Sequence, residues 1–219
     1  MYLYDLHSHT AEGSRCAALK GEELAALYAR KGYAGFTVTD HFFGGNTAVE
    51  RSLPWEEWVE GFCRGWRAAK EAGERLNLQV FFGWEYYYKG TEFLTYGLDV
   101  GFLKAHPELA FLPLPDYCRL IHASGGILVH AHPFCRRRSV PVIRLMPEWT
   151  DAVETVNKKV EPRANFLADQ YADNFNLKKV GGTDLHRTEQ PMGGIALPAA
   201  APDIRTLFEM VGSNKTRII

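Results

Sequence analysis

The residues best suited to chemistry in this 219-residue chain are its histidines, of which there are eight. Two pairs have the spacing His-x-His: His7 with His9, and His130 with His132. Alternate residues of a β-strand point to the same side, so each pair would aim both imidazoles in one direction. One such pair could arise by chance, whereas two pairs in one chain are stronger evidence that the histidines belong to a shared site.

Carboxylates accompany two of the other histidines. Asp40-His41 and the Asp-x-His spacing of Asp184 and His186 each join an acid to an imidazole, and Glu85 follows another short apolar run. Imidazoles with a bridging carboxylate are the ligand set of Zn, Mn or Fe in multinuclear sites. The alternative is a set of unrelated core histidines satisfied by hydrogen bonds. The sequence favours the metal site.

These residues stand at the ends of short apolar runs that predict strands buried on both faces. Helical patterns separate the runs. We expect strands at 3–7, 35–39, 79–83, 93–96, 126–129, 152–156 and 179–182. We expect helices at 22–31, 54–76, 116–124, 163–175 and 202–211.

Strands that alternate with helices favour parallel pairing through right-handed crossovers. Seven of them suggest a closed or nearly closed barrel, in which the carboxyl ends of the strands form one face and their side chains converge. An open doubly wound sheet is the alternative, but the chain has no Gly-x-Gly-x-x-Gly loop to support a nucleotide site there. Since no low-complexity linker or composition break interrupts the chain, we expect a single domain over residues 1–219.

In their order along the chain, these motifs resemble those of the PHP family, named for polymerase and histidinol phosphatase. The matching segments are Asp5-Leu6-His7-Ser8-His9-Thr10, Thr39-Asp40-His41, Trp84-Glu85, Ala131-His132-Pro133 and Gly182-Thr183-Asp184-Leu185-His186. Residues 151–157 also resemble the family's strand before the last motif. The resemblance implies an α/β fold, a distorted (β/α)7 TIM-like barrel with two or three divalent metal ions at the C-terminal face of the strands.

The resemblance also implies which residues bind the metals. The first ion would be held by His7, His9, Glu85 and Asp184. Glu85 would bridge to a second ion that His132 also binds. A third ion would use His41 and His186.

The chain departs from the family pattern at two places. Many relatives have a further His or Asp shortly after the first pair, whereas residues 14–16 read Ser-Arg-Cys here and leave Glu12 as the nearby candidate. Many also have a His near the fourth strand. Glu92 could replace it with a carboxylate oxygen, or could be an exposed loop carboxylate.

Other polar residues near the motifs are expected to act behind the ligands. Asp5 and Asp40 would point away from the site on their strands and orient ligands by hydrogen bonds, or serve the structure. His130 shares the side of His132 by spacing and is interpreted as such an outer partner or as a core residue. His106 and His122 are expected at the surface or at helix caps.

Arginines near the motifs are candidates for binding a phosphate. Arg15 follows the first histidine pair, and Arg136 and Arg137 follow His132. Guanidinium groups bind phosphate through paired, charge-assisted hydrogen bonds. The alternative for each is a solvated basic surface.

The predicted function is a metal-dependent hydrolase of phosphate esters, acting on a small phosphorylated metabolite, a nucleotide or a phosphopeptide. Metals that share a carboxylate activate water and neutralise phosphoryl oxygens, so a metal-activated water is the favoured nucleophile. Asp184 or His186 would relay protons. The chain has no Gly-x-Ser-x-Gly motif, and Cys135 has no motif that marks a nucleophile.

Two other functions stay open. An amidohydrolase-type enzyme that cleaves C–N or C–O bonds also begins with His-x-His, but that class usually bridges its metals with a modified lysine on the fourth strand, and no lysine stands at that strand's end. A non-catalytic module stabilised by metal is less favoured because the ligand set is nearly complete.

Composition restricts the partners and the compartment. Lys and Arg number 25 against 26 Asp and Glu, for a net charge of -1, which disfavours binding to long nucleic acid. Neither a secretory signal nor an apolar run of membrane-spanning length is visible. The four cysteines form no Cys-x-x-Cys pair and are expected to be reduced, partly buried thiols. We expect a cytoplasmic protein without a membrane partner.

Overall fold

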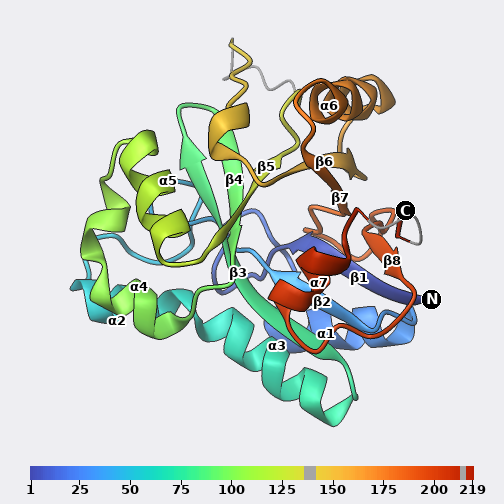
Figure 1. Ribbon diagram of the computed structural model, residues 1–219. Helices are drawn as coiled ribbons and strands as arrows, with labels where there is room; N and C mark the ends of the chain where they lie inside the picture. The colour runs from blue at the N-terminus through green and yellow to red at the C-terminus, as the bar shows by residue number, and fades with distance from the viewer. Residues whose placement is uncertain (136–141, 213–215) are drawn as a thin grey trace.

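The computed structural model describes residues 1–135, 142–212 and 216–219 (Figure 1). The described residues form a nine-stranded sheet in the order β7-β6-β5-β4-β3-β2-β1-β8-β9. The strands are β1 Tyr2–Ser8, β2 Gly35–Val38, β3 Gln79–Tyr88, β4 Thr91–Tyr96, β5 Ile127–Ala131, β6 Ala152–Asn157, β7 Lys178–Gly182, β8 Ile195–Leu197 and β9 Arg217–Ile218.

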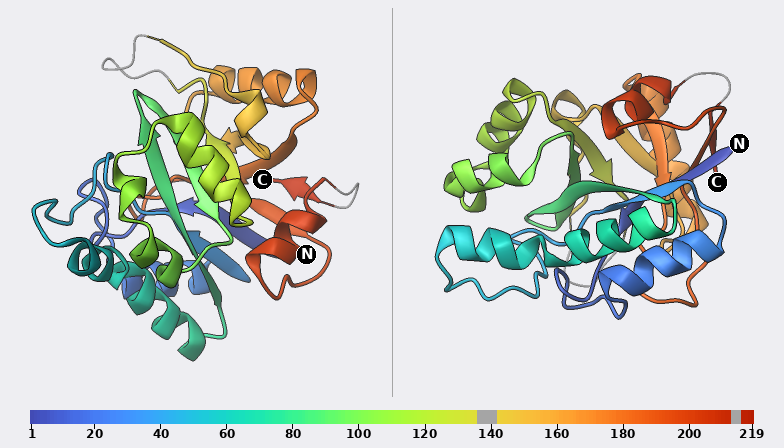
Figure 2. Two further views of the ribbon diagram at one scale, coloured as in Figure 1. Left: turned by 60° about the vertical axis from the view of Figure 1, so that its left-hand side comes forward. Right: turned by 90° about the horizontal axis from the view of Figure 1, so that it is seen from below.

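Helices cover the sheet on several sides. They are α1 Gly21–Arg30, α2 Trp55–Phe62, α3 Arg64–Arg75, α4 Val100–Ala105, α5 Leu114–Ala123, α6 Pro162–Asn174 and α7 Ile204–Met210, with short 3₁₀ helices at Pro107–Ala110 and Pro147–Trp149. Helices α1, α2 and α3 lie along one side of the molecule, and α6 covers β6 and β7 on another (Figures 1 and 2). No helix in the described ranges combines the length and apolar character that crossing a bilayer requires.

All seven predicted strands are present, but one runs in the opposite direction. The pairings among β1, β2 and β3 and among β5, β6 and β7 are parallel, as expected. The prediction of parallel pairing throughout is wrong at β4, which is antiparallel to both β3 and β5. Lys89 and Gly90 join β3 to β4 with φ of 47° and 91°. Two residues with positive φ make a tight hairpin, which leaves no room for the crossover that a parallel strand needs.

The sheet is nearly closed, as expected for a barrel. Just after β7, Leu185 forms a parallel bridge with Ser8 at the end of β1. The Leu185 N–H donates to the His7 carbonyl (3.3 Å), and the His9 N–H donates to the Leu185 carbonyl (3.1 Å). The N-terminal half of β1 pairs instead with β8, a strand that sequence patterns did not predict. The first and last barrel strands therefore meet at the end that carries the histidines.

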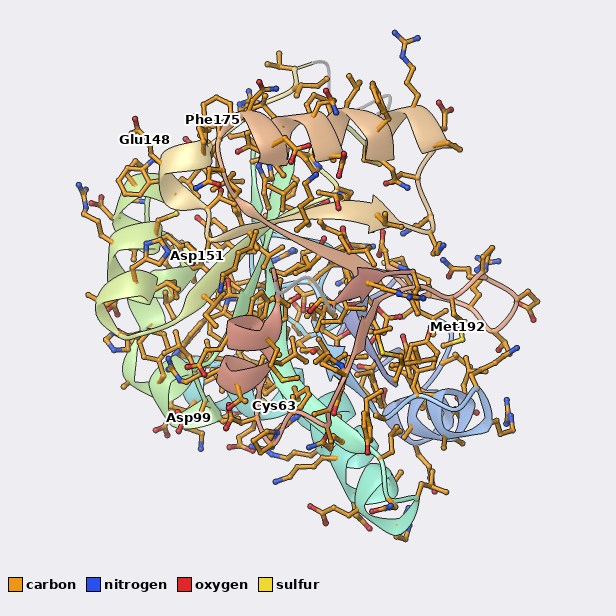
Figure 3. The ribbon with its side chains drawn as sticks, turned by 45° about the vertical axis from the view of Figure 1, so that its right-hand side comes forward. Cys63, Asp99, Glu148, Asp151, Phe175 and Met192 are labelled. Atoms are coloured by element: carbon orange, nitrogen blue, oxygen red, sulfur yellow. The ribbon has the colours of Figure 1, made fainter. Side chains whose placement is uncertain are left out.

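The helix predicted over residues 54–76 is two helices. It is divided at Cys63, which ends α2 and precedes α3 (Figure 3). The break turns α3 along α1, and Gly65 allows a close approach, since a Cβ there would overlap Thr10 Oγ1. The loop after β1 is thereby held against α3.

The start of β6 is fixed by an acidic side chain. The carboxylate of Asp151 accepts from the Leu128 N–H (2.8 Å) and lies 3.0 Å from His122 Nε2 (Figure 3). This contact joins α5, β5 and β6 and places His122 at the periphery, as expected.

Candidate metal centre

Seven predicted ligands, six of them at or just after strand ends and Glu85 inside β3, lie in one buried cluster. Each is at most 6% exposed. The members are His7, His9, His41, Glu85, His132, Asp184 and His186. Possible ligand atoms lie within 4.8 Å of one another in four groups, namely His9/His41/His186, His7/Glu85/His132, His7/His9/Asp184 and His41/Glu85/Glu92.

Glu85 stands at the centre of this cluster. Its Oε1 lies 3.4 Å from His7 Nε2 and 3.3 Å from His132 Nε2. Its Oε2 lies 2.5 Å from His41 Nδ1 and 3.8 Å from His9 Nε2. The two carboxylate oxygens thus face different imidazoles, which is the arrangement of a bridging ligand.

Asp184 closes the cluster from the loop after β7. Its Oδ1 lies 3.2 Å from both His9 Nε2 and His186 Nδ1, and 3.6 Å from His7 Nε2. Its backbone has φ of 54°, a left-handed conformation that is rare outside glycine. A strained residue of this kind persists where the surroundings hold it, commonly at functional sites.

Several atoms of the cluster are buried without a hydrogen bond. Among the described residues, both oxygens of Glu85, His41 Nδ1 and His132 Nε2 lie at ion-pair distances from one another but in no hydrogen-bonding geometry. A buried polar atom left in this state costs about 1–3 kcal/mol. Divalent cations would satisfy all four atoms, and imidazole and carboxylate are donors that Zn, Mn and Fe accept. The residues therefore fit a metal centre.

The charges of the cluster are strongly coupled. Burial acts to raise the pKa of Glu85, but the imidazoles of His41 and His7 outweigh it and hold that pKa well below its usual range. Burial also opposes ionisation of Asp184, yet His7 and His9 hold its pKa well below normal. Both carboxylates are anionic at neutral pH, which is the form that binds cations.

The two candidates from the family's variable positions differ. Glu92 lies on β4, is 4% exposed and has its Oε2 3.6 Å from His132 Nε2. It belongs to the cluster and is not an exposed loop carboxylate. Glu12 is not brought to the cluster, because its carboxylate accepts from the Gly21 N–H at the start of α1 (3.1 and 3.3 Å).

Asp40 orients the His9 imidazole through Ser14. Its Oδ1 accepts from the Ser14 hydroxyl (2.7 Å), and Ser14 Oγ lies 3.1 Å from His9 Nδ1. The Ser14 hydroxyl donates its hydrogen bond to the Asp40 carboxylate, so its oxygen accepts from His9 Nδ1–H. The Nε2 lone pair of His9 then points at the cluster, the orientation that outer partners impose on metal-binding imidazoles.

Asp5 acts on the backbone. It accepts from the His7 N–H (3.1 Å), the Thr183 N–H (3.0 Å), the Thr183 hydroxyl and the Tyr28 hydroxyl (2.7 Å). It ties β1 to the end of β7 and to α1 without contacting an imidazole. Of its two predicted roles, the contacts are those of the structural one.

The prediction that His130 shares the side of His132 is wrong. His130 stacks on Phe93 (centroids 4.9 Å apart), contacts Tyr171 of α6 and has its Nε2 2.9 Å from Thr91 Oγ1. Burial lowers its pKa to about 3, so it is neutral. The alternation fails because β5 ends at Ala131 and His132 has φ of 28°, which turns its side chain into the cluster. His130 is the core residue of the two alternatives.

Sequence reasoning missed Glu154. This β6 residue is 1% exposed, its Oε1 lies 3.0 Å from His7 Nδ1, and its Oε2 accepts from the His132 N–H (3.0 Å) and from Asn157 Nδ2 (2.9 Å). A lone carboxylate in the middle of the apolar run 152–156 was the available signal, because a buried charge requires partners.

Lys159 and Cys16 were also missed. Lys159 Nζ lies 3.1 Å from Asp184 Oδ2 and 3.2 Å from His186 Nδ1. Cys16 Sγ lies 3.0 Å from His186 Nε2. Both line an open pocket of about 510 Å³ with His41, Glu92 and His186, so the cluster is reached from the surface here. Neither residue belongs to a sequence motif that would have marked it.

Of the predicted phosphate-binding arginines, Arg15 is held by a backbone carbonyl. Arg15 donates from Nε to the Thr47 carbonyl (2.9 Å), which fixes its side chain against the loop after β2. Arg136 and Arg137 lie outside the described residues.

The similarity between this chain and known proteins lies in structure. No protein-family model matches the sequence, and no curated protein matches it. A two-domain protein from Bacteroides vulgatus, described as containing a predicted PHP-like metal-dependent phosphoesterase, is similar at 16% identity with a TM-score of 0.75, over 100% of this chain and 64% of that one. The chain shares its fold.

Two further solved structures are similar. PsfC from Pseudomonas syringae is 18% identical, with a TM-score of 0.65 over 100% of this chain and 91% of that chain. An amidohydrolase from Chromobacterium violaceum, whose structure has bound sulfate and no metal, is 17% identical, with a TM-score of 0.58 over 94% and 95% of the two chains. The fold is therefore shared with a protein described as containing a predicted PHP-like metal-dependent phosphoesterase and with one described as an amidohydrolase.

Proposed function

We propose that the chain is a PHP-family hydrolase that uses two or three divalent metal ions to cleave phosphate esters. The observation that carries the proposal is the carboxylate of Glu85, with His7 and His132 facing one oxygen and His9 and His41 facing the other. A residue so placed is suited to bridge two cations. The shared fold with a PHP-like phosphoesterase supports the proposal.

The residues would divide the work as follows. His7, His9, Asp184 and His132 would hold the two ions that Glu85 joins, with Glu92 beside His132, and His41 and His186 would hold a third ion. Divalent ions at these positions supply Lewis acidity and a reactive form of water at neutral pH. The net reaction breaks the P–O bond to the alcohol, forms a new P–O bond from water and returns a proton to the alcohol.

Asp184 is the better of the two predicted proton carriers. Its Oδ1 lies 3.2 Å from His9 Nε2 and from His186 Nδ1. The ring nitrogens of His186 are already engaged, Nδ1 with the Asp184 carbonyl (2.7 Å) and Nε2 with Cys16 (3.0 Å). We therefore propose that Asp184 accepts the proton that water loses, and that His186 holds the Asp184 side chain in position.

Cleavage of C–N bonds is the second candidate. The fold similarity to an amidohydrolase favours it, although the sulfate bound in that structure has the shape and charge of a phosphate group. In this chain the residue that faces imidazoles with both of its oxygens is Glu85, not a lysine. A small anionic phosphate ester therefore remains the proposed substrate.

Metal analysis and a substrate screen test the proposal together. Protein purified without chelator should contain at least two equivalents of Zn, Mn or Fe, and should release phosphate from a panel of phosphorylated metabolites, nucleotides and phosphopeptides. Asp184→Asn should abolish release, whereas Asp116→Asn in the first turn of α5 should not. Folded protein without metal would overturn the proposal, and release of ammonia from amides in place of phosphate would favour the alternative.

A further inference from the structure

A thiol stands beside the outer histidines of the cluster. Cys16 Sγ lies 3.0 Å from His186 Nε2 and also hydrogen-bonds His41. All three residues line the open pocket. Cys16 lies in the stretch where the chain departs from the family's usual His or Asp, and neither sequence reasoning nor the proposed function gives it a role.

The loop holds this thiol in place. The Arg15 N–H donates to the Asn46 carbonyl (3.0 Å), in the loop that follows His41. The Ala18 N–H donates to the His186 carbonyl (2.9 Å). The backbone on both sides of Cys16 is therefore tied to the segments that carry the two histidines, so the three side chains meet by construction of the fold.

A second observation points to a cation here. His41 is 6% exposed, and its Nδ1, although 2.5 Å from Glu85 Oε2, has no partner in hydrogen-bonding geometry among the described residues. His41 and His186 also form a group with His9 whose possible ligand atoms lie within 4.8 Å of one another. Imidazole nitrogens that could bind a cation are thus gathered next to the Cys16 sulfur, and not all of them are hydrogen-bonded.

The distances suit tetrahedral zinc after a small adjustment. Bonds of about 2.3 Å to sulfur and about 2.0–2.1 Å to nitrogen put tetrahedral S and N ligands roughly 3.6 Å apart. The observed 3.0 Å between Cys16 Sγ and His186 Nε2 is within a side-chain rotation of that value. Thiolate is a soft ligand that selects zinc over manganese, whereas carboxylate suits manganese.

We propose that Cys16 is a thiolate ligand of a metal ion that it shares with His41 and His186, and that it makes this position zinc-selective. The inference rests on the metal centre of the proposed function but not on the reaction it performs. The alternative is a thiolate that pairs with the two imidazoles and never contacts a metal.

Cobalt substitution distinguishes the two. Chelator-treated protein is titrated with Co²⁺, and the near-ultraviolet absorption that arises only from sulfur bound to cobalt is followed together with bound metal per chain. The wild type should develop this band, Cys16→Ser should lose it, and Cys135→Ser, which changes the other partly exposed cysteine, should keep it. In Cys16→Ser, the affinity for the weakest-bound ion should fall by at least roughly 10–100-fold, which is the loss caused by removing an outer partner of a ligand.

A third variant guards against simple damage to the loop. Cys16→Asp supplies an oxygen ligand, so it should retain the metal count, lack the sulfur band and lose the preference for Zn²⁺ over Mn²⁺ in competition. Wild-type protein that binds two or more cobalt ions without the band would overturn the inference and leave the proposed function standing. A band in protein that hydrolyses no phosphate ester would do the reverse. An equal band in wild type and Cys16→Ser would assign the sulfur to another cysteine and overturn the inference.

Discussion

Glu154 Oε1 lies 3.0 Å from His7 Nδ1, with both residues buried at the junction of β6 and β1. An ionised carboxylate only accepts hydrogen bonds, so Nδ1 carries a proton and Nε2 is turned toward Glu85 and Asp184. Burial acts to lower the pKa of His7, but Glu154, Asp184 and Glu85 raise it well above normal. The histidine is thus oriented toward cations by a residue that does not itself face them.

Replacing Glu154 with Gln should weaken the metal centre without removing any ligand. Glu154 accepts from three donors, the His7 ring, the His132 N–H and Asn157 Nδ2. An amide has one oxygen, so at least one donor loses its partner. Loss of an outer partner of this kind lowers metal affinity or activity by roughly 10–100-fold.

Competition with a chromogenic chelator measures this change. Glu209→Gln, an exposed substitution on α7, is the matched control and should retain wild-type affinity. Equal affinity in Glu154→Gln and wild type would mean that the pair with His7 serves packing only.

The gathering of the cluster could be predicted because strand ends of a barrel meet on one face, and six of the seven candidate ligands stand at or just after such ends, with Glu85 inside β3. Two features could not be predicted, because they depend on single backbone angles. The Lys89-Gly90 turn reverses β4, and the positive φ of His132 separates it from His130.

A third kind of feature depends on contacts between distant parts of the chain. Glu154 meets His7 across 147 residues, and Cys16 meets His186 across 170. Their residue types alone do not reveal such contacts, since a carboxylate or a thiol also occurs in many other environments. Only the closure of the sheet between β1 and the end of β7 brings them together.

Alanine variants of His130 and His132 should have opposite effects. His130 is packed between Phe93 and Tyr171, so His130→Ala opens a cavity and should lower the free energy of unfolding by about 2–4 kcal/mol. Metal content should stay unchanged. His132→Ala removes a candidate ligand from the group that contains Glu85, so the amount of metal bound per chain should fall.

Denaturant unfolding and elemental analysis of the same samples separate the two effects. Loss of metal in His130→Ala, with unfolding free energy unchanged, would contradict the assignment of His130 to the core.

Lys159 should contribute to substrate binding. Its Nζ lies 3.1 Å from Asp184 Oδ2, and its side chain is 41% exposed at the pocket that leads to the cluster. A cation at this place would donate to a phosphate oxygen, a charged hydrogen bond worth about 1.5–3 kcal/mol. Lys159→Met should therefore raise KM at least about tenfold, since 1.4 kcal/mol is a factor of ten.

Steady-state kinetics on the best substrate of the screen test this, with Lys158→Met as the neighbouring control. An unchanged KM in Lys159→Met would assign the lysine to holding Asp184 alone. In that case kcat should fall in its place.

The buried cysteines should resist alkylation over a wide pH range. Burial raises the pKa of both Cys63 and Cys118 to about 12, against 9.0 for an ordinary thiol. Alkylation requires the thiolate, which forms only above the pKa, so neither residue should react with iodoacetamide in native protein between pH 7 and about 10. Because the folded-state pKa lies above the unfolded one, these thiols favour the folded state below about pH 9, and that contribution is lost as the pH rises toward 12.

Peptide mass spectrometry of native and denatured samples checks the prediction, with partly exposed Cys135 as the internal reference. Native labelling of Cys63 or Cys118 with a midpoint near pH 9 would contradict their placement in the core.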